Sequence, residues 1–105
     1  MIQTDLYFGQ SRPDGTVITE AEWQSFKIEQ LSRVFKEGST TISATGNWYD
    51  PERHTLITEP TYVVVHHYKK SRQKSAQIDS LVNVYKVMFK QQSVLRVDTK
   101  VKAKF

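Results

Sequence analysis

The sequence contains no cysteine, only four glycines and three prolines, and no long apolar run. The lack of cysteine excludes disulfides, thiolate nucleophiles, iron–sulfur clusters and cysteine-based zinc sites. No run approaches the roughly 18–20 apolar residues of a membrane span. Residues 1–5 also lack the basic and apolar regions of a signal peptide. We therefore expect no membrane partner and a cytoplasmic location.

The residues that are present suffice for one small domain. A length of 105 residues fits a single domain over residues 1–105. Hydrophobic residues make up 38% of the chain and charged residues 25%, as in ordinary globular domains. The two Trp, five Tyr and five Phe argue against intrinsic disorder.

The hydrophobic pattern predicts six elements in the order strand, helix, strand, strand, helix, strand. The strand segments are clearest where apolar and polar residues alternate with a period of two. The helical segments carry broad apolar faces, and Thr19 with Glu22 has the spacing of a capping box. The predicted strands are residues 2–8, 40–49, 54–68 and 94–105, and the predicted helices are residues 19–36 and 71–91. Because proline cannot donate to the ladder, we expect a bulge or a bend at Pro60.

This order of elements has one dominant arrangement, the ferredoxin-like βαββαβ sandwich of the α+β class. In this fold an antiparallel four-stranded sheet carries two helices on one face. The other face has apolar side chains whichever phase each strand adopts, because residues such as Val63, Val64 and Val65 follow one another. Monomers rarely expose a contiguous apolar patch of that size. We therefore expect a homodimer in which two sheets pack face to face.

Four short motifs lie within residues 4–65, at residues 4–9 (TDLYFG), 15–23, 46–48 (GNW) and 58–61 (TEPT). Together they resemble a bacterial domain-of-unknown-function family with a T-x-L-Y-F-G start, a G-x-V-[ST] helix entry with Glu and Trp, a G-x-W strand and an E-P step. The resemblance implies the dimeric α+β barrel group of ferredoxin-like folds. Exported relatives in that family leave export open for this chain. The resemblance carries over no catalytic residue.

Charge is distributed unevenly along the chain. Residues 1–60 have a net charge of −4 and residues 61–105 a net charge of +8. The cluster Lys69, Lys70, Arg72 and Lys74 could grip phosphates, and the same fold hosts RNA-recognition modules. The third strand nevertheless lacks the Arg/Lys-Gly-aromatic core of those modules, which disfavours nucleic acid. Solvated lysines that protect an edge strand are the simpler explanation.

The three histidines are His54, His66 and His67. Adjacent strand residues point to opposite faces, so His66 and His67 cannot both bind one metal ion. We expect no metal site and no cofactor. One of the two histidines should face the core or a cavity, where a neutral-range pKa would suit a general base. His66 and His67 are therefore catalytic candidates, and Tyr7, an aromatic of the first strand that could line a pocket, is a third.

The candidate ligand-binding residues are Arg12, Trp48, Glu59 and Tyr62. Strand aromatics such as Trp48 and Tyr62 could line an apolar pocket with a few polar groups, although core and dimer packing would use them equally well. Arg12 lies in a turn-forming loop, where it could clamp an anion. Glu59 precedes Pro60, where the expected bulge would re-aim its carboxylate.

Two classes of function remain open from the sequence. The first is a small-molecule-binding protein or a cofactor-independent enzyme of the dimeric α+β barrel type. The alternative is a non-catalytic binding module that contacts an acidic partner or nucleic acid through the basic C-terminal half.

Overall fold

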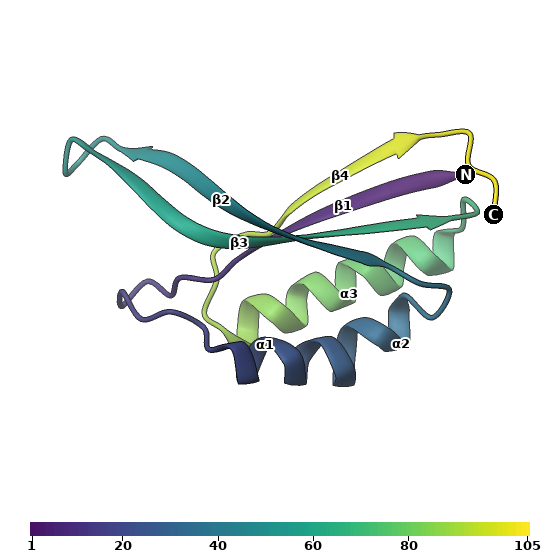
Figure 1. Cartoon of the computed structure of the whole chain (residues 1–105), viewed down its shortest axis with the longest axis horizontal. Helices are drawn as coiled ribbons and strands as arrows, with labels where there is room; N and C mark the ends of the chain where they lie inside the picture. The colour runs from purple at the N-terminus through teal and green to yellow at the C-terminus, as the bar shows by residue number, and fades with distance from the viewer.

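A computed structural model describes residues 1–105 and shows the predicted order of elements (Figure 1). The strands are β1 (Ile2–Gly9), β2 (Thr40–Asp50), β3 (Thr55–Tyr68) and β4 (Leu95–Lys100). The helical segments are α1 (Glu20–Phe26), η1 (Lys27–Leu31), α2 (Ser32–Val34) and α3 (Arg72–Met88). The four strands form one antiparallel sheet in the order β2-β3-β1-β4. This is the ferredoxin-like βαββαβ sandwich, and the predicted fold class is confirmed. None of its helices is long and apolar enough to cross a membrane.

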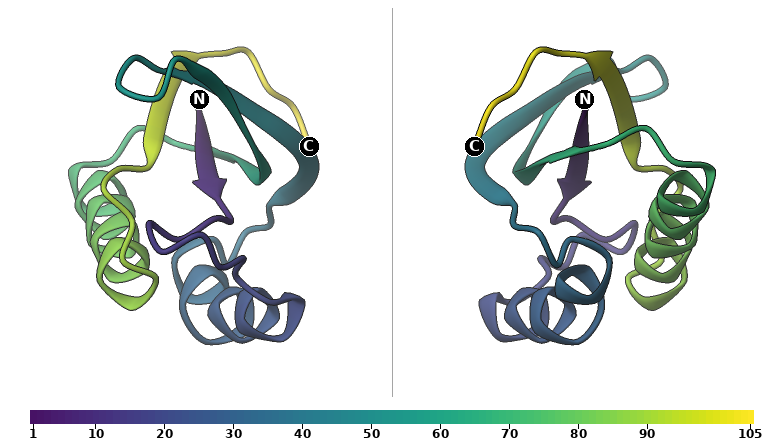
Figure 2. Two further views of the ribbon diagram at one scale, coloured as in Figure 1. Left: turned by 90° about the vertical axis from the view of Figure 1, so that its left-hand side faces the viewer. Right: turned by 90° about the vertical axis from the view of Figure 1, so that its right-hand side faces the viewer.

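The continuous helix formed by α1, η1 and α2 lies on the same face of the sheet as helix α3, as the two end views in Figure 2 show. The core between them contains a tight aromatic cluster. The Phe8 ring on β1 lies 5.5 Å from Trp23 and 4.6 Å from Tyr85, measured between ring centroids. Trp23, on the first turn of the first helix, is only 1% exposed. These contacts fix the helices against β1 and β3.

The first helix begins at the predicted capping box. The Thr19 hydroxyl accepts the Glu22 N–H at 3.1 Å, and the Glu22 carboxylate accepts the Thr19 N–H at 3.0 Å. The helix continues without a break to Val34, but η1 has π-helical geometry. A π turn advances about one residue more than an α turn. Phe26 and Leu31, five residues apart, can therefore both face the core.

The ends of two elements differ from the sequence prediction. Strand β4 ends at Lys100 rather than residue 105, because Lys100 pairs with Ile2 at the start of β1 and little partner strand remains beyond it. Helix α3 ends at Met88, and Lys90 adopts a positive φ of 55°. Of the bulge or bend expected at Pro60, the bulge is absent, since the β2–β3 register runs unbroken through Thr45 and Pro60.

The position of Pro60 explains why the sheet tolerates it. Its carbonyl accepts the Gln10 N–H at 2.9 Å, so the polar atoms of Pro60 face the β1 side and not β2. The pairing of β1 with β3 ends at Gly9 and Thr61. The missing N–H therefore costs no ladder hydrogen bond.

The sheet face opposite the helices has no cover. We call this the open face. Its apolar residues are Tyr7, Ile42, Val63, Val65, Leu95 and Val97. Val63 and Val65 on this face are only half-buried in the single chain, whereas Val64 on the helix side is fully buried. Polar residues occupy the end of the open face nearest the chain termini, where Gln3 donates to Asp5 at 3.0 Å and lies 3.2 Å from His67 Nε2.

Candidate functional site

A cavity of about 660 Å³ lies where the β2–β3 hairpin meets the β1–α1 and α3–β4 loops. We call it the hairpin-end cavity. Figure 1 shows these three segments gathered at one end of the molecule. Three predicted ligand-binding residues line it: Arg12, Trp48 and Glu59. The other lining residues are Ser11, Pro13, Gly15, Asp50, Arg53, Ile57, Lys90, Gln91, Gln92 and Ser93.

Two glycines on the flanking strands leave room for Glu59 and its neighbour Thr61. A Cβ atom on Gly9 would lie 2.9 Å from Glu59 Oε1, a separation that would force the carboxylate to move. A Cβ atom on Gly46, the β2 partner of Glu59, would lie 2.8 Å from Thr61 Oγ1. The Ser11 N–H donates to Glu59 Oε2 at 3.2 Å. The Glu59 carboxylate therefore lies over the backbone of Gly9, while Gly46 leaves room for the Thr61 hydroxyl beside it.

Trp48 supplies an aromatic wall. It pairs with Ile57 across the hairpin, on the side of the ribbon that continues the open face. Half of its surface is exposed, at 52%, although it belongs to a strand. The next residue, Tyr49, is equally exposed at 57% but points to the other side of the hairpin, away from the cavity lining. An exposed indole in a polar cavity can stack on a planar ligand.

Arg12 is a fixed cation rather than a free one. Its guanidinium forms an ion pair with Glu22 and lies 5.7 Å from the centroid of the Phe89 ring. Hydrogen bonds from the Thr19 backbone and from Arg12 hold the pKa of Glu22 below its ordinary value. Arg53, 3.8 Å from Asp50, and Lys90 add two more cations to the lining.

Hydrogen bonds hold the loops around the cavity together. Gly15 occupies a positive φ of 87°, and the turn is closed by the Arg12 N–H, which donates to Thr16 O at 2.8 Å. The Asp14 carboxylate accepts the Thr16 side-chain hydroxyl and N–H, and these bonds lower the pKa of Asp14. The Gln91 amide donates to Ser11 O at 2.9 Å, which ties the α3–β4 loop to the β1–α1 loop. The cavity walls are therefore largely pre-formed.

Tyr62, the fourth predicted ligand-binding residue, lies elsewhere. Its ring stacks on Trp23 at 4.7 Å and 17° between planes, and its hydroxyl donates to Glu20 at 2.7 Å. This bond to the Glu20 carboxylate raises the pKa of Tyr62. Tyr62 therefore packs the sheet against the first helix.

The three catalytic candidates, His66, His67 and Tyr7, also lie outside the cavity lining. His66 and His67 point to opposite faces, as adjacent strand residues must. His66 is fully buried in the core, whereas His67 is on the open face beside Gln3. Tyr7 is on the open face too, two residues before Gly9. No three His, Asp or Glu side chains gather closely enough to hold a metal ion.

The four motifs in residues 4–65 converge on the hairpin-end cavity. Gly9 ends the first motif and underlies Glu59, and Gly15 starts the second. Trp48 belongs to the third and Glu59 to the fourth. The sequence displayed these residues, but not that Gly9 makes room for the Glu59 carboxylate or that Lys90 and Gln91 complete the wall. The β1–β3 register, which brings segments about 50 residues apart into contact, reveals the first, and the packing of the α3–β4 loop on the β1–α1 loop reveals the second.

Comparison with known proteins places the chain among proteins of similar sequence and fold. A family model described as "Protein of unknown function (DUF3574)" matches residues 3–105. No curated protein matches. A phage SAM lyase in complex with S-methyl-5'-thioadenosine has a similar fold, with a TM-score of 0.72, 14% identity, and coverage of 94% of this chain and 80% of that chain. The apo state of a phage SAM lyase matches with a TM-score of 0.69, 15% identity, and coverage of 93% and 78%.

Proposed function

The chain belongs to the DUF3574 family, and we propose that it is a small-molecule-binding protein whose ligand occupies the hairpin-end cavity. The single observation that carries this proposal is the meeting of Trp48, Glu59 and Arg12 in one pre-formed cavity of about 660 Å³. That volume lies in the range of about 300–1,000 Å³ that is typical of small-ligand sites.

The lining favours a nucleoside-type ligand. A purine ring would stack on the exposed face of Trp48. Ribose hydroxyls would donate to Glu59, whose Oε1 has no hydrogen-bond donor in the structure. The similar fold of phage SAM lyase, at 14% identity, supports only the choice of probes, S-methyl-5'-thioadenosine and SAM.

Any reaction at this site would rely on the side chains of the lining. Glu59 and Asp50 are the carboxylates of the cavity, and either could act on a proton of the ligand or balance a positive charge on it. The general base would then be a carboxylate rather than His66 or His67, since neither histidine lines the cavity.

The proposal includes a homodimer formed through the open face. Ile42 is 49% exposed and Leu95 is 59% exposed, and both lie in one apolar patch with Val63 and Tyr7. A two-fold pairing of sheets would bury on the order of 2,000 Å² and remove this patch from water. Because Glu59 and Trp48 continue the open face, the second copy would lie beside the hairpin-end cavity.

The alternative, a binding module for acidic partners, has less support. Lys74 pairs with Glu37 at 3.0 Å, and Arg96 pairs with Asp79 at 2.8 Å and with Asp98 at 3.1 Å. Two cations of the basic half are thus already neutralised within the fold.

The test is isothermal titration of the protein with S-methyl-5'-thioadenosine and with SAM. We expect Trp48→Ala to weaken binding about tenfold or more, because stacking of one base contributes about 1–3 kcal/mol. Tyr49→Ala is the matched control, and it should bind like the wild type because Tyr49 faces away from the cavity. Equal losses in both variants, or no binding of either probe, would contradict a nucleoside site. Mass spectrometry of the SAM incubation would reveal turnover.

A further inference from the structure

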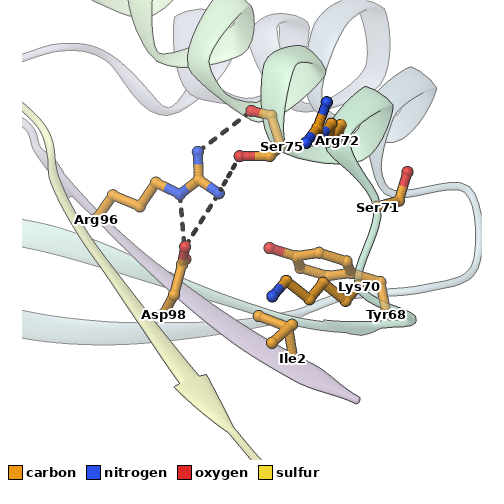
Figure 3. Close-up of a pocket in the computed structure, with 8 residues that line it drawn as sticks. All are labelled: Ile2, Tyr68, Lys70, Ser71, Arg72, Ser75, Arg96 and Asp98. Carbon is orange, nitrogen blue, oxygen red and sulfur yellow. Dashed lines mark hydrogen bonds and ion pairs between the residues drawn. The ribbon is translucent and has the colours of Figure 1, made fainter.

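A second cavity, of about 360 Å³, lies at the other end of the molecule beside the first turn of α3. We call it the α3-end cavity. Figure 3 shows its side chains, which come from β1, the end of β3, the β3–α3 loop, α3 and β4. Three of them are cations, Lys70, Arg72 and Arg96, and one is an acid, Asp98. The lining therefore has a net charge of +2.

A hydrogen-bond network centred on Arg96 and Asp98 fixes one wall of the α3-end cavity. Arg96 grips both oxygens of Asp98 at 3.1 Å, and it also donates to Ser75 Oγ at 3.1 Å and Ser75 O at 3.2 Å. Thr4 Oγ1 donates its only proton to Asp98 at 2.7 Å. The 2.6 Å contact between Thr4 Oγ1 and Tyr68 therefore has the tyrosine as donor. Desolvation raises the pKa of Asp98, but the bonds from Arg96 and Thr4 outweigh it, so the carboxylate stays ionised.

The groups of this cavity that remain free are cations and hydrogen-bond donors. Lys70 and Arg72 have no ion-pair partner in the structure, whereas Arg96 is neutralised by Asp98 and Asp79. The Ser75 hydroxyl accepts from Arg96, and the Ser71 hydroxyl accepts from the Lys74 N–H at 3.1 Å. Neither hydroxyl donates to a protein group, so both protons are available to a ligand.

We propose that the α3-end cavity binds a small phosphate-bearing anion through Lys70, Arg72 and the hydroxyls of Ser71 and Ser75. Arginine offers a planar fork to phosphate oxygens, lysine offers a point charge, and serine hydroxyls donate to the remaining oxygens. A volume of about 360 Å³ accommodates a phosphate group with a small organic substituent. This site is separate from the hairpin-end cavity and goes beyond the proposed function.

The geometry favours a small ligand over a nucleic-acid strand. Of the cluster Lys69, Lys70, Arg72 and Lys74 that the sequence displays, Lys74 is held by Glu37 and the Val34 carbonyl. Two unpaired cations, Lys70 and Arg72, remain at the cavity, and they line one pocket rather than an extended groove. Binding of a single phosphate group requires no more than this.

The test is titration of the whole protein with inorganic phosphate and with ribose 5-phosphate, followed by calorimetry and by amide NMR signals. We expect one site per chain, with shifts concentrated at residues 71–75. Arg72→Gln should weaken binding about tenfold, because it removes a charge-assisted hydrogen bond to the anion. Lys36→Gln removes the same charge from an exposed position without an ion pair and should change nothing.

Three outcomes would overturn the site. The first is an equal loss in Arg72→Gln and Lys36→Gln, or no binding of either phosphate. The second is competition by S-methyl-5'-thioadenosine, which contains no phosphate and would locate the anion in the hairpin-end cavity. The third is binding of a short single-stranded RNA by a protein that ignores ribose 5-phosphate, which would assign the cations to nucleic acid. Failure of the nucleoside probes alone leaves the phosphate measurement unaffected.

Discussion

The Nε2 atom of His66 lies 3.4 Å from Oε2 of Glu37, although the imidazole is fully buried and the carboxylate is more than half exposed. The other ring nitrogen, Nδ1, lies 2.6 Å from the Gly38 carbonyl and so carries the proton. The ring is stacked between Phe35 and Tyr68, at 4.2 and 5.3 Å between centroids. In the neutral ring Nε2 is therefore an acceptor without a donor, facing a carboxylate.

Opposing influences act on the pKa of His66. Burial lowers the pKa of His66 and so does the Lys74 cation, whereas the Gly38 carbonyl and Glu37 raise it. The neighbouring His67 lowers it further. Burial is the largest of these influences, and the net result is a pKa below the ordinary 6.5. His66 is thus neutral in the folded protein at neutral pH.

We predict that the free energy of unfolding falls as the pH drops below 6.5, the ordinary histidine value. Between pH 6.5 and the lower pKa of folded His66, the unfolded chain binds a proton that the folded chain does not bind. Protonation therefore favours the unfolded chain, and the stability present above pH 6.5 falls as the pH approaches the pKa of folded His66. Urea unfolding at a series of pH values measures the slope. Carboxylates with lowered pKa values, such as Glu37, contribute only at more acidic pH.

A direct check is the NMR titration of the three imidazoles in the wild-type protein. The His66 signal should titrate with a midpoint below 6.5. A His67→Gln variant should keep most of the stability slope, because His67 lies on the open face. A His66 midpoint at or above 6.5 would mean that attraction to Glu37 outweighs burial and would reverse the sign of the slope.

Trp23→Ala should destabilise the fold by roughly 3–5 kcal/mol, the range for deleting a large aromatic side chain from a core. The indole is fully buried and contacts the rings of Phe8, Phe26 and Tyr62. Denaturant melts give the value, with Trp48→Ala as the matched control on an exposed tryptophan. A loss of less than about 1 kcal/mol for Trp23→Ala would contradict a core role.

Gly9→Ala should weaken ligand binding in the hairpin-end cavity more than it weakens the fold. The new methyl would lie 2.9 Å from Glu59 Oε1, and the carboxylate is the flexible end of a side chain that can swing away. Titration with S-methyl-5'-thioadenosine should then show a loss close to that of Glu59→Gln. Thermal melts should show a small change. If binding by Gly9→Ala is intact, the position of the Glu59 carboxylate does not matter for the ligand.

The sequence predicts local features well because local features depend on neighbouring residues. The alternation of β3 places His66 and His67 on opposite faces, and the Thr19–Glu22 spacing gives the observed cap. The end of β4 was missed because it depends on where β1 begins, which is not visible within residues 94–105. The only feature of the sequence that indicates the π turn in η1 is the five-residue spacing between Phe26 and Leu31, which both face the core.

The candidate site was predictable in its residues but not in its assembly. Arg12, Trp48 and Glu59 are marked by residue type and by turn or strand context. Tyr62 is also an aromatic residue on a strand, yet its position on β3 places its side chain on the helix side of the sheet, against Trp23. The partners of Lys74 and Arg96 were equally hidden, since Glu37 is 37 residues from Lys74 along the chain. Long-range pairing decides which charges are free.

The last prediction is the homodimer, which rests on the composition of the open face. Ile42 on β2 and Val63 on β3 are register partners there, and Leu95 and Val97 on β4 extend the patch across the sheet. Ile42 is 49% exposed in the single chain, although it belongs to a strand with an apolar neighbour. Pairing with a second copy removes this surface from water, at about 25 cal/mol per Å² of apolar area.

Light scattering at micromolar concentration should therefore give a mass of twice 12.2 kDa. Ile42→Lys would place a charge inside the interface and should shift the protein to the monomer, because an unpaired charge is costly to bury. Val87→Lys is the matched control, since Val87 is 80% exposed on α3, away from the open face. A wild-type mass of 12.2 kDa would refute the dimer and leave the open face as a surface for another partner. A dimer that survives Ile42→Lys but not Val87→Lys would place the interface on the helices instead.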